Sequence, residues 1–308
     1  MKALLFPGQG SQIVGMGSGF YNDFDQAKKL FAEADEKLKF KISKVILEGP
    51  DSDLKLTQNT QPAILLVSYV IFQILKKEFG LNIKDYKYFA GHSLGEYSAL
   101  VCSESLSFTD ALFLVNERGK EMQNAVPIGK GAMLAVLGSS IEEIDNFIKK
   151  LKSQGVCEIA NDNSDGQTII SGDVESINNL QELLKLNKKK SIKLPVSAPF
   201  HCSLMNSAAN KMSSKIKNIN FKNPIVEIIT NVKAEPEIDS NKIKDLLIQQ
   251  IYSKVRWRES ILYMKSKNIN EFIEIGPGKV LSGLVKRINK EFKTSSINSV
   301  EDIKNTSI

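Results

Sequence analysis

Histidine and cysteine are scarce in this sequence of 308 residues, which has only two histidines and three cysteines. The cysteines, Cys102, Cys157 and Cys202, are odd in number and form no Cys-x-x-Cys pair. We therefore expect no disulfide framework, no structural zinc and a reducing compartment. Any imidazole base must be His92 or His201.

Long apolar runs are also missing. The N-terminal run, residues 1–6, is stopped by "PGQG" and is too short for the apolar region of a signal peptide. The most apolar later stretch, residues 63–75, falls short of a membrane span and is interrupted by Ser68 and Gln73. We expect a soluble, cytoplasmic protein with no membrane partner.

The charge excess is small, with 41 basic residues against 35 acidic ones and a net charge of +6. Lysines gather at 149–152 and 188–190. Such runs are typical of solvated faces, and a docking patch for an acidic partner is the alternative. The basic runs lack interleaved aromatic residues and any recognisable binding module, so we expect no nucleic-acid partner.

Apolar patterning predicts an α/β body. Apolar stretches that end at glycine turns indicate buried strands, and apolar positions at helical spacing indicate helices. The expected strands are 2–6, 86–93, 225–231 and 269–278, and the expected helices are 61–79, 94–103 and 109–126. Thr109 or Asp110 suits the N-cap of the last of these helices. The final dozen residues are polar and are expected to fray.

The pattern changes after Pro127. Strands at 131–138, 157–164, 167–173 and 191–198 alternate with helices at 141–155 and 174–187. This β-α-β-β-α-β order is the ferredoxin-like pattern. We expect a hydrolase-like catalytic body with a parallel sheet, formed by residues 1–126 and 199–308. A ferredoxin-like subdomain, residues 127–198, would be inserted into it.

One short motif suggests catalysis. Gly91-x-Ser93-x-Gly95 lies between an apolar strand and a helix, as in a nucleophile elbow. The alternative is an ordinary glycine-rich turn. A serine nucleophile needs a base, and neighbouring side chains on a tight elbow diverge, so His92 is poorly placed. His201 is then the candidate, although by itself it could equally be a histidine at the start of a helix.

Two other glycine turns do not match cofactor loops. The turn at 8–17 has Ile13 where a dinucleotide fingerprint needs its third glycine. The "GPGKV" turn at 276–280 lacks the first glycine of a phosphate loop and ends in Val280 rather than serine or threonine. Beside an elbow, the first turn could instead present backbone N–H groups as an oxyanion hole.

Six motifs in one order then give a resemblance. They are "FPGQGSQ" (6–12), "GHSLGEYSAL" (91–100), "RGKEMQ" (118–123), "APFHCSLM" (198–205), "QQIYSKVRW" (249–257) and "EIGPGKVLSGLVKRI" (274–288). In this the chain resembles the malonyl-CoA:acyl-carrier-protein transacylases. The resemblance implies transfer of malonyl from malonyl-CoA to acyl carrier protein for fatty-acid synthesis. It also implies a monomer and the same two-part fold; we expect no metal and no cofactor.

The resemblance also implies roles for individual residues. Ser93 would attack the thioester in a ping-pong mechanism and His201 would take its proton. The N–H groups of Gln12 and Leu94 would hold the oxyanion, and Gln250 would orient the histidine. Near Gln250 the family often has Asn-Pro-Val where this chain has Ser-Lys-Val at 253–255.

Substrate choice would depend on Arg118 and Phe200. A guanidinium binds a carboxylate through two parallel charge-assisted bonds, which suits the free carboxylate of malonyl. Without the resemblance, Arg118 reads as a surface residue paired with Glu117 or Glu121. Phe200, just before His201, favours malonyl over methylmalonyl, as a Phe-His pair does in related polyketide acyltransferases.

Rival functions remain at this point. They are a serine esterase or thioesterase with water as acceptor, a transferase that serves a polyketide carrier, and a carrier-binding protein without activity. A hydrolase of this class normally runs Ser, Asp/Glu, His and gives no reason for a carboxylate-binding arginine.

Overall fold

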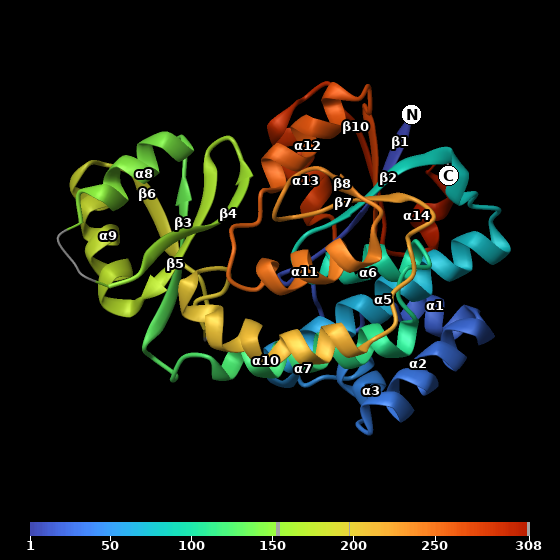
Figure 1. Ribbon diagram of the computed structural model, residues 1–308. Helices are drawn as coiled ribbons and strands as arrows, with labels where there is room; N and C mark the ends of the chain where they lie inside the picture. The colour runs from blue at the N-terminus through green and yellow to red at the C-terminus, as the bar shows by residue number, and fades with distance from the viewer. Residues whose placement is uncertain (152–154, 197, 307–308) are drawn as a thin grey trace.

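A six-stranded sheet forms the centre of the larger part of the molecule (Figure 1). The computed structural model describes residues 1–151, 155–196 and 198–306. The strand order is β10-β9-β1-β2-β7-β8, and every pair is parallel except β7 with β8. The strands are β1 (Lys2–Phe6), β2 (Tyr86–Gly91), β7 (Glu227–Ile229), β8 (Pro236–Glu237), β9 (Glu271–Ile275) and β10 (Lys293–Ile297).

Helices cover both faces of this sheet because alternate strand residues point to opposite sides. In β1, Leu4 and Phe6 join the larger apolar cluster, whereas Ala3 and Leu5 join a second one. The second cluster is closed by α12 (Trp257–Ser266) and α13 (Val280–Ile288). The larger is covered by α1 (Ser18–Asp23), α2 (Asp25–Leu38), α3 (Ile42–Leu47), α4 (Asp51–Leu54), α5 (Thr57–Glu78), α6 (Gly95–Cys102), α7 (Phe108–Asn124), α10 (Asn206–Asn218), α11 (Ser240–Gln250) and α14 (Val300–Lys304). Two 3₁₀ turns, η1 (Ile83–Asp85) and η2 (Ser203–Met205), complete this part.

A four-stranded antiparallel sheet forms the smaller part, with the order β4-β5-β3-β6 (Figure 1). Two helices cover one of its faces through a separate apolar cluster. Its other face contributes Met133, Ala135 and Ile169 to the large cluster. The elements are β3 (Gly131–Leu137), α8 (Ile141–Lys149), β4 (Cys157–Ser164), β5 (Gln167–Asp173), α9 (Val174–Leu186) and β6 (Lys190–Lys193).

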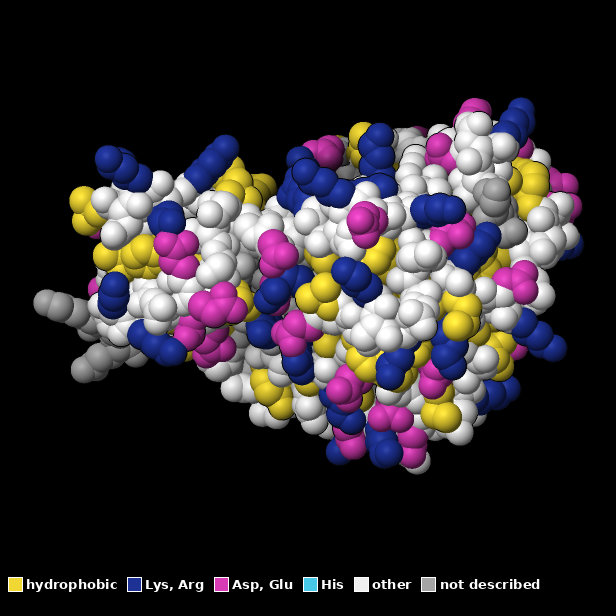
Figure 2. All heavy atoms as spheres, turned by 90° about the horizontal axis from the view of Figure 1, so that it is seen from above, with side chains coloured by type: hydrophobic (Ala, Val, Ile, Leu, Met, Phe, Trp, Pro, Cys, Tyr) yellow, Lys and Arg dark blue, Asp and Glu magenta, His cyan; other side chains and the backbone are white. Residues whose placement is uncertain are grey.

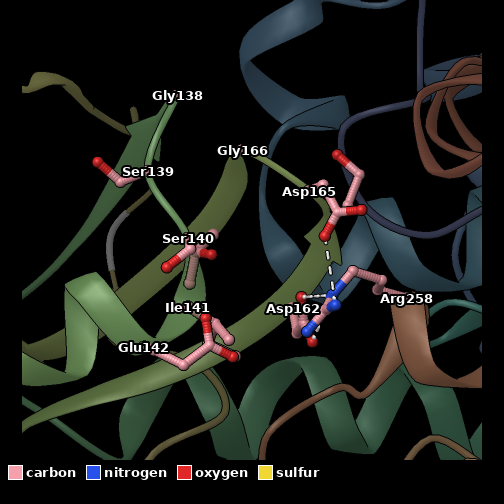
Figure 3. A pocket seen from close by; sticks show the side chains of 11 residues that line it. Gly138, Ser139, Ser140, Ile141, Glu142, Asp162, Asp165, Gly166 and Arg258 are labelled. Carbon is pink, nitrogen blue, oxygen red and sulfur yellow. Dashed lines mark hydrogen bonds and ion pairs between the residues drawn. The ribbon is translucent and has the colours of Figure 1, made fainter.

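Strand β4 is joined directly to the larger part. Its backbone exchanges hydrogen bonds with Val255, from Val255 N to Ala160 O (2.8 Å) and from Asp162 N to Val255 O (3.0 Å). Figure 3 shows Arg258, from α12, reaching Asp162 and Asp165 in a cavity of about 360 Å³. Its Nε lies 2.9 Å from Asp162 Oδ1. The segment after α11 and the β4–β5 hairpin are therefore held as a unit.

Several expected elements differ from the observed ones. Ser107, rather than Thr109 or Asp110, caps α7, because its hydroxyl accepts from Asp110 N. The strand expected at 191–198 is the shorter β6, and Ser197 lies outside the described residues. The helix expected at 141–155 is the shorter α8, which ends at Lys149. Residues 152–154 lie outside the described residues. The tail expected to fray contains α14, whose N-terminus is stabilised by a capping box of Ser299 and Asp302.

Acidic and basic side chains are interspersed on the face seen from above, with no single block of one sign (Figure 2). None of the helices in the described ranges has the length and apolar content needed to cross a bilayer.

Candidate active site

Ser93 lies on a strained turn between β2 and α6. Its φ is 54°, in the left-handed region that non-glycine residues rarely adopt. The two flanking glycines permit the turn: a Cβ on Gly91 would lie 1.9 Å from the backbone of Gly95, and one on Gly95 would lie 2.2 Å from the Phe6 carbonyl. The sequence motif therefore corresponds to a real elbow, which points Ser93 into a cavity.

His201, and not His92, meets the serine. Its Nε2 lies 2.8 Å from Ser93 Oγ, and its Nδ1 lies 2.8 Å from the main-chain carbonyl of Gln250. A carbonyl only accepts hydrogen bonds, so Nδ1 carries the proton and Nε2 is free to accept one from the serine. Burial, followed by the positive charge of Arg118, lowers the pKa of His201 to about 3. The imidazole is thus neutral near pH 7.

His92 has a different environment. Its Nε2 lies 2.9 Å from Asn163 Oδ1 on β4, and its ring lies 5.6 Å from that of Trp257. Burial lowers the pKa of His92 below its usual value. The elbow histidine therefore links the turn to the β4–β5 hairpin, while His201 makes the contact with the serine hydroxyl.

Arg118 is buried, only 1% exposed, on α7. Its Nη1 donates to Gln61 Oε1 (2.7 Å), and its Nη2 donates to Gln250 Oε1 (2.9 Å) and to Ser93 Oγ (3.1 Å). Within the described ranges its Nε has no acceptor. Burial lowers the pKa of Arg118, and the nearby Tyr97 and Glu96 oppose this shift. A buried guanidinium beside a nucleophile has the donors that an anion such as a carboxylate could accept from.

The surface pairing considered for Arg118 does not occur. Glu117 instead pairs with Lys120 and Lys215, and Glu121 pairs with Lys215 as well as Lys211. These glutamates lie on the outer side of α7, whereas the arginine points inward.

Gln250, at the end of α11, contributes more than one contact. Besides its carbonyl on His201, its side-chain Nε2 donates to the Ser93 carbonyl (3.0 Å) and to Glu96 Oε2 (2.8 Å). Asn231 accepts a hydrogen bond from Ser93 N (2.7 Å) and donates one to Gly91 O (2.7 Å). Sequence reasoning missed Asn231, Glu96, Gln61 and Asn163. Glu96 lies within the quoted motif at 91–100 but was given no role there, and the other three lie outside the quoted motifs.

Gln12 and Leu94 border the same cavity as Ser93, as an oxyanion hole requires. No described residue accepts a hydrogen bond from the backbone N–H of either one. The Gln12 side chain accepts from Gly10 N (2.7 Å), which ties the first glycine turn together. A Cβ on Gly8 would lie 2.5 Å from the His92 carbonyl, so this glycine lets the turn approach the elbow closely.

The cavity has a volume of about 520 Å³, enough for part of a cofactor-sized substrate. Its lining includes Ser93, His201 and Arg118, together with residues of the β4–β5 hairpin and the segment 194–196. Phe200 is 7% exposed and also lines it. Among the described residues no group of three or more histidine, cysteine, aspartate or glutamate side chains could hold a metal ion.

Comparison with known proteins gives one consistent result. The family model described as the acyl transferase domain matches residues 3–308. A malonyl CoA-acyl carrier protein transacylase from Bacillus subtilis is 45% identical over 98% of this chain and 94% of its own length. The Escherichia coli protein of the same name is 39% identical over 96% of this chain and 95% of its own.

Solved structures agree with this. An acyl-carrier-protein-S-malonyltransferase from Bartonella henselae has a TM-score of 0.96 at 42% identity, over 99% of this chain and 97% of its own. A malonyl-transacylase solved in complex with a type II PKS acyl-carrier protein has a TM-score of 0.95 at 36% identity, over 99% and 98%.

Proposed function

Because this chain belongs to the acyl transferase family, and within it to the malonyl CoA-acyl carrier protein transacylases, we propose that it transfers malonyl from malonyl-CoA to the phosphopantetheine thiol of acyl carrier protein. It is an acyltransferase, and the product supplies fatty-acid synthesis. The observation that supports the choice of acyl group is the buried guanidinium of Arg118, 3.1 Å from Ser93 Oγ.

The first half-reaction would load the enzyme. Ser93 Oγ attacks the thioester carbon while its proton passes to His201 Nε2, 2.8 Å away. The imidazolium that forms keeps its Nδ1–H, which donates a hydrogen bond to the Gln250 carbonyl. The C–S bond then breaks, CoA leaves with the proton from His201, and malonyl remains as an ester on Ser93.

The oxyanion of each tetrahedral intermediate would be held by the N–H groups of Leu94 and Gln12. Both border the cavity and neither has an acceptor among the described residues, which supports this role. Leu94 directly precedes α6, so the positive end of this helix adds to the field at the developing charge.

The second half-reaction would reverse these roles. The carrier's phosphopantetheine thiol gives its proton to His201 and attacks the malonyl ester. Ser93 then leaves as the alcohol after taking the proton back. Malonyl thus moves from one thioester to another, and the overall reaction neither takes up nor releases protons or electrons.

The malonyl carboxylate would bind Arg118. One methylene separates this carboxylate from the thioester carbon, so its counter-ion must lie close to the nucleophile, as the Nη2–Oγ distance allows. An acetyl group leaves the buried guanidinium without a partner, and sites of this kind reject such analogues by roughly 10⁴. Phe200, in the cavity wall, would crowd a branch methyl and disfavour methylmalonyl.

We further propose two structural units. Residues 1–126 and 199–308 form a hydrolase-like catalytic body, and 127–198 form an inserted ferredoxin-like subdomain. The order β4-β5-β3-β6, with α8 and α9 on one face, supports the second unit. A cytoplasmic monomer completes the proposal.

Acylation by labelled malonyl-CoA tests this function. The wild type should retain one malonyl on Ser93 and pass it to holo acyl carrier protein, whereas Ser93→Ala should take no label. Rapid release of free malonate to water in the absence of a thiol acceptor would indicate a hydrolase. Comparing fatty-acid and polyketide carrier proteins as acceptors distinguishes the two kinds of transferase.

A further inference from the structure

Glu96 is a buried carboxylate that the mechanism above does not use. It lies in the first turn of α6 and is 1% exposed, and the nearby positive charge of Arg118 acts on it. Burial raises the pKa of Glu96 to about 7. Burying an acid is unfavourable unless hydrogen bonds or an opposite charge compensate it.

Both of its hydrogen-bond partners hold catalytic groups. Glu96 Oε2 accepts from Asn231 N (2.9 Å) and from Gln250 Nε2 (2.8 Å). The Asn231 side chain in turn holds the backbone of the elbow at Gly91 and Ser93. The Gln250 side chain holds Arg118 through Oε1.

The orientation of the Gln250 amide decides whether Arg118 has an acceptor. Glu96 Oε2 is an acceptor, since Asn231 N already donates to it, so it draws the NH₂ group of Gln250 toward itself and leaves Oε1 facing the guanidinium. The Ser93 carbonyl takes the other amide hydrogen at 3.0 Å. If the Gln250 amide were reversed, its NH₂ group would face the Nη2 donor of Arg118, and the arginine would lose this acceptor.

We propose that Glu96 is a positioning residue for substrate selection, which fixes the Gln250 amide and through it the direction of Arg118. This inference rests on the proposed function. It predicts that the acceptor oxygen of Glu96 matters more for malonyl than for acetyl, because only malonyl uses the arginine.

The experiment compares the kcat/KM of enzyme acylation by malonyl-CoA and by acetyl-CoA. Glu96→Ala should lower the malonyl value about tenfold to a hundredfold, the range expected for loss of a charged hydrogen bond, mainly through KM. The acetyl value should fall much less. Glu96→Gln should restore most of the malonyl preference, because its amide oxygen can accept the same two bonds.

Asp35 supplies a matched control. It is another buried carboxylate, 8% exposed, and it accepts from Ser43 N (2.9 Å) and Ser43 Oγ (2.6 Å). It also pairs with Lys41 (3.3 Å) and is not part of the cavity lining. Asp35→Ala should lower the melting temperature yet keep the malonyl-to-acetyl ratio. Should Glu96→Ala fail to fold, Gln250→Leu tests the same link: it keeps the carbonyl on His201 and should lose the ratio.

An equal fall in both values for Glu96→Ala, or an unchanged ratio in Gln250→Leu, would overturn the inference. Failure of Glu96→Gln to restore the preference would also overturn it, since charge and not the acceptor would then matter. A wild type that shows no malonyl preference would instead refute the proposed function, so the two failures are distinguishable.

Discussion

Replacing Arg118 by alanine should convert a malonyl-selective enzyme into one with little preference. The guanidinium is buried, has no carboxylate partner among the described residues and lies 3.1 Å from Ser93 Oγ. Two charge-assisted bonds to the malonyl carboxylate at about 1.5–3 kcal/mol each amount to roughly 3–6 kcal/mol. The malonyl kcat/KM should therefore fall by about 10²- to 10⁴-fold.

Acetyl-CoA should behave differently, because it makes no such bonds. The positive charge of Arg118 also lowers the pKa of His201, so its removal favours the imidazolium that forms during attack. Against this, the oxygens of Gln61 and Gln250 lose a donor, which costs about 1–3 kcal/mol for each buried group. We expect the acetyl rate to change far less than the malonyl rate.

Rapid-quench acylation with radiolabelled malonyl-CoA and acetyl-CoA measures both values. Arg118→Lys keeps the charge but loses the planar fork, so it should fall between wild type and alanine. Arg287→Ala, at an exposed position on α13, controls for the loss of a positive charge. Retention of the wild-type malonyl-to-acetyl ratio in Arg118→Ala would refute the role assigned to the arginine.

Three further outcomes follow from the site and the elbow. Burial lowers the pKa of His201 to about 3, so below pH 6.5 the unfolded chain binds a proton that the native state does not. As the pH is lowered from 6.5 to 4, the free energy of unfolding of the wild type should therefore fall more steeply than that of His201→Gln, as measured by urea titration. Gly95→Ala should cost about 2–4 kcal/mol because its Cβ would meet the Phe6 carbonyl at 2.2 Å, whereas Gly283→Ala, where nothing lies within 4 Å, should be neutral or stabilising by urea titration. Phe200→Ser should raise acylation by methylmalonyl-CoA relative to malonyl-CoA, and an unchanged ratio would remove Phe200 from substrate selection.

The elements predicted well are those with strong apolar patterns. The buried strands β1 and β2 and the long helix α5 have continuous or periodic apolar residues, so their existence is clear from sequence although α5 begins four residues earlier than expected. By contrast, β10 reads Lys-Thr-Ser-Ser-Ile and was not predicted. It is an edge strand that pairs only with β9. Backbone hydrogen bonds to β9 hold this strand in the sheet, and the spacing of apolar residues in the sequence gives no sign of them.

The candidate base could be found because histidine is so scarce. With two histidines, and because neighbouring side chains on a tight elbow are expected to diverge, elimination left His201, and the geometry brings it to Ser93 Oγ at 2.8 Å. Glu96 and Asn231 gave no such signal. Each is an ordinary polar residue in sequence, and its meaning depends on burial and on partners more than 130 positions away.

Gly119 shows that one signal was present and went unused. A glycine inside a helix is unfavourable by about 1 kcal/mol, so it needs a packing reason. Here a Cβ would lie 2.7 Å from both Gln58 Cα and the Thr57 carbonyl at the start of α5. The missing side chain lets α7 approach α5 closely, which brings Arg118 within 2.7 Å of Gln61. The glycine after the arginine could thus have indicated from sequence that this part of α7 is buried, and with it that Arg118 is no surface residue.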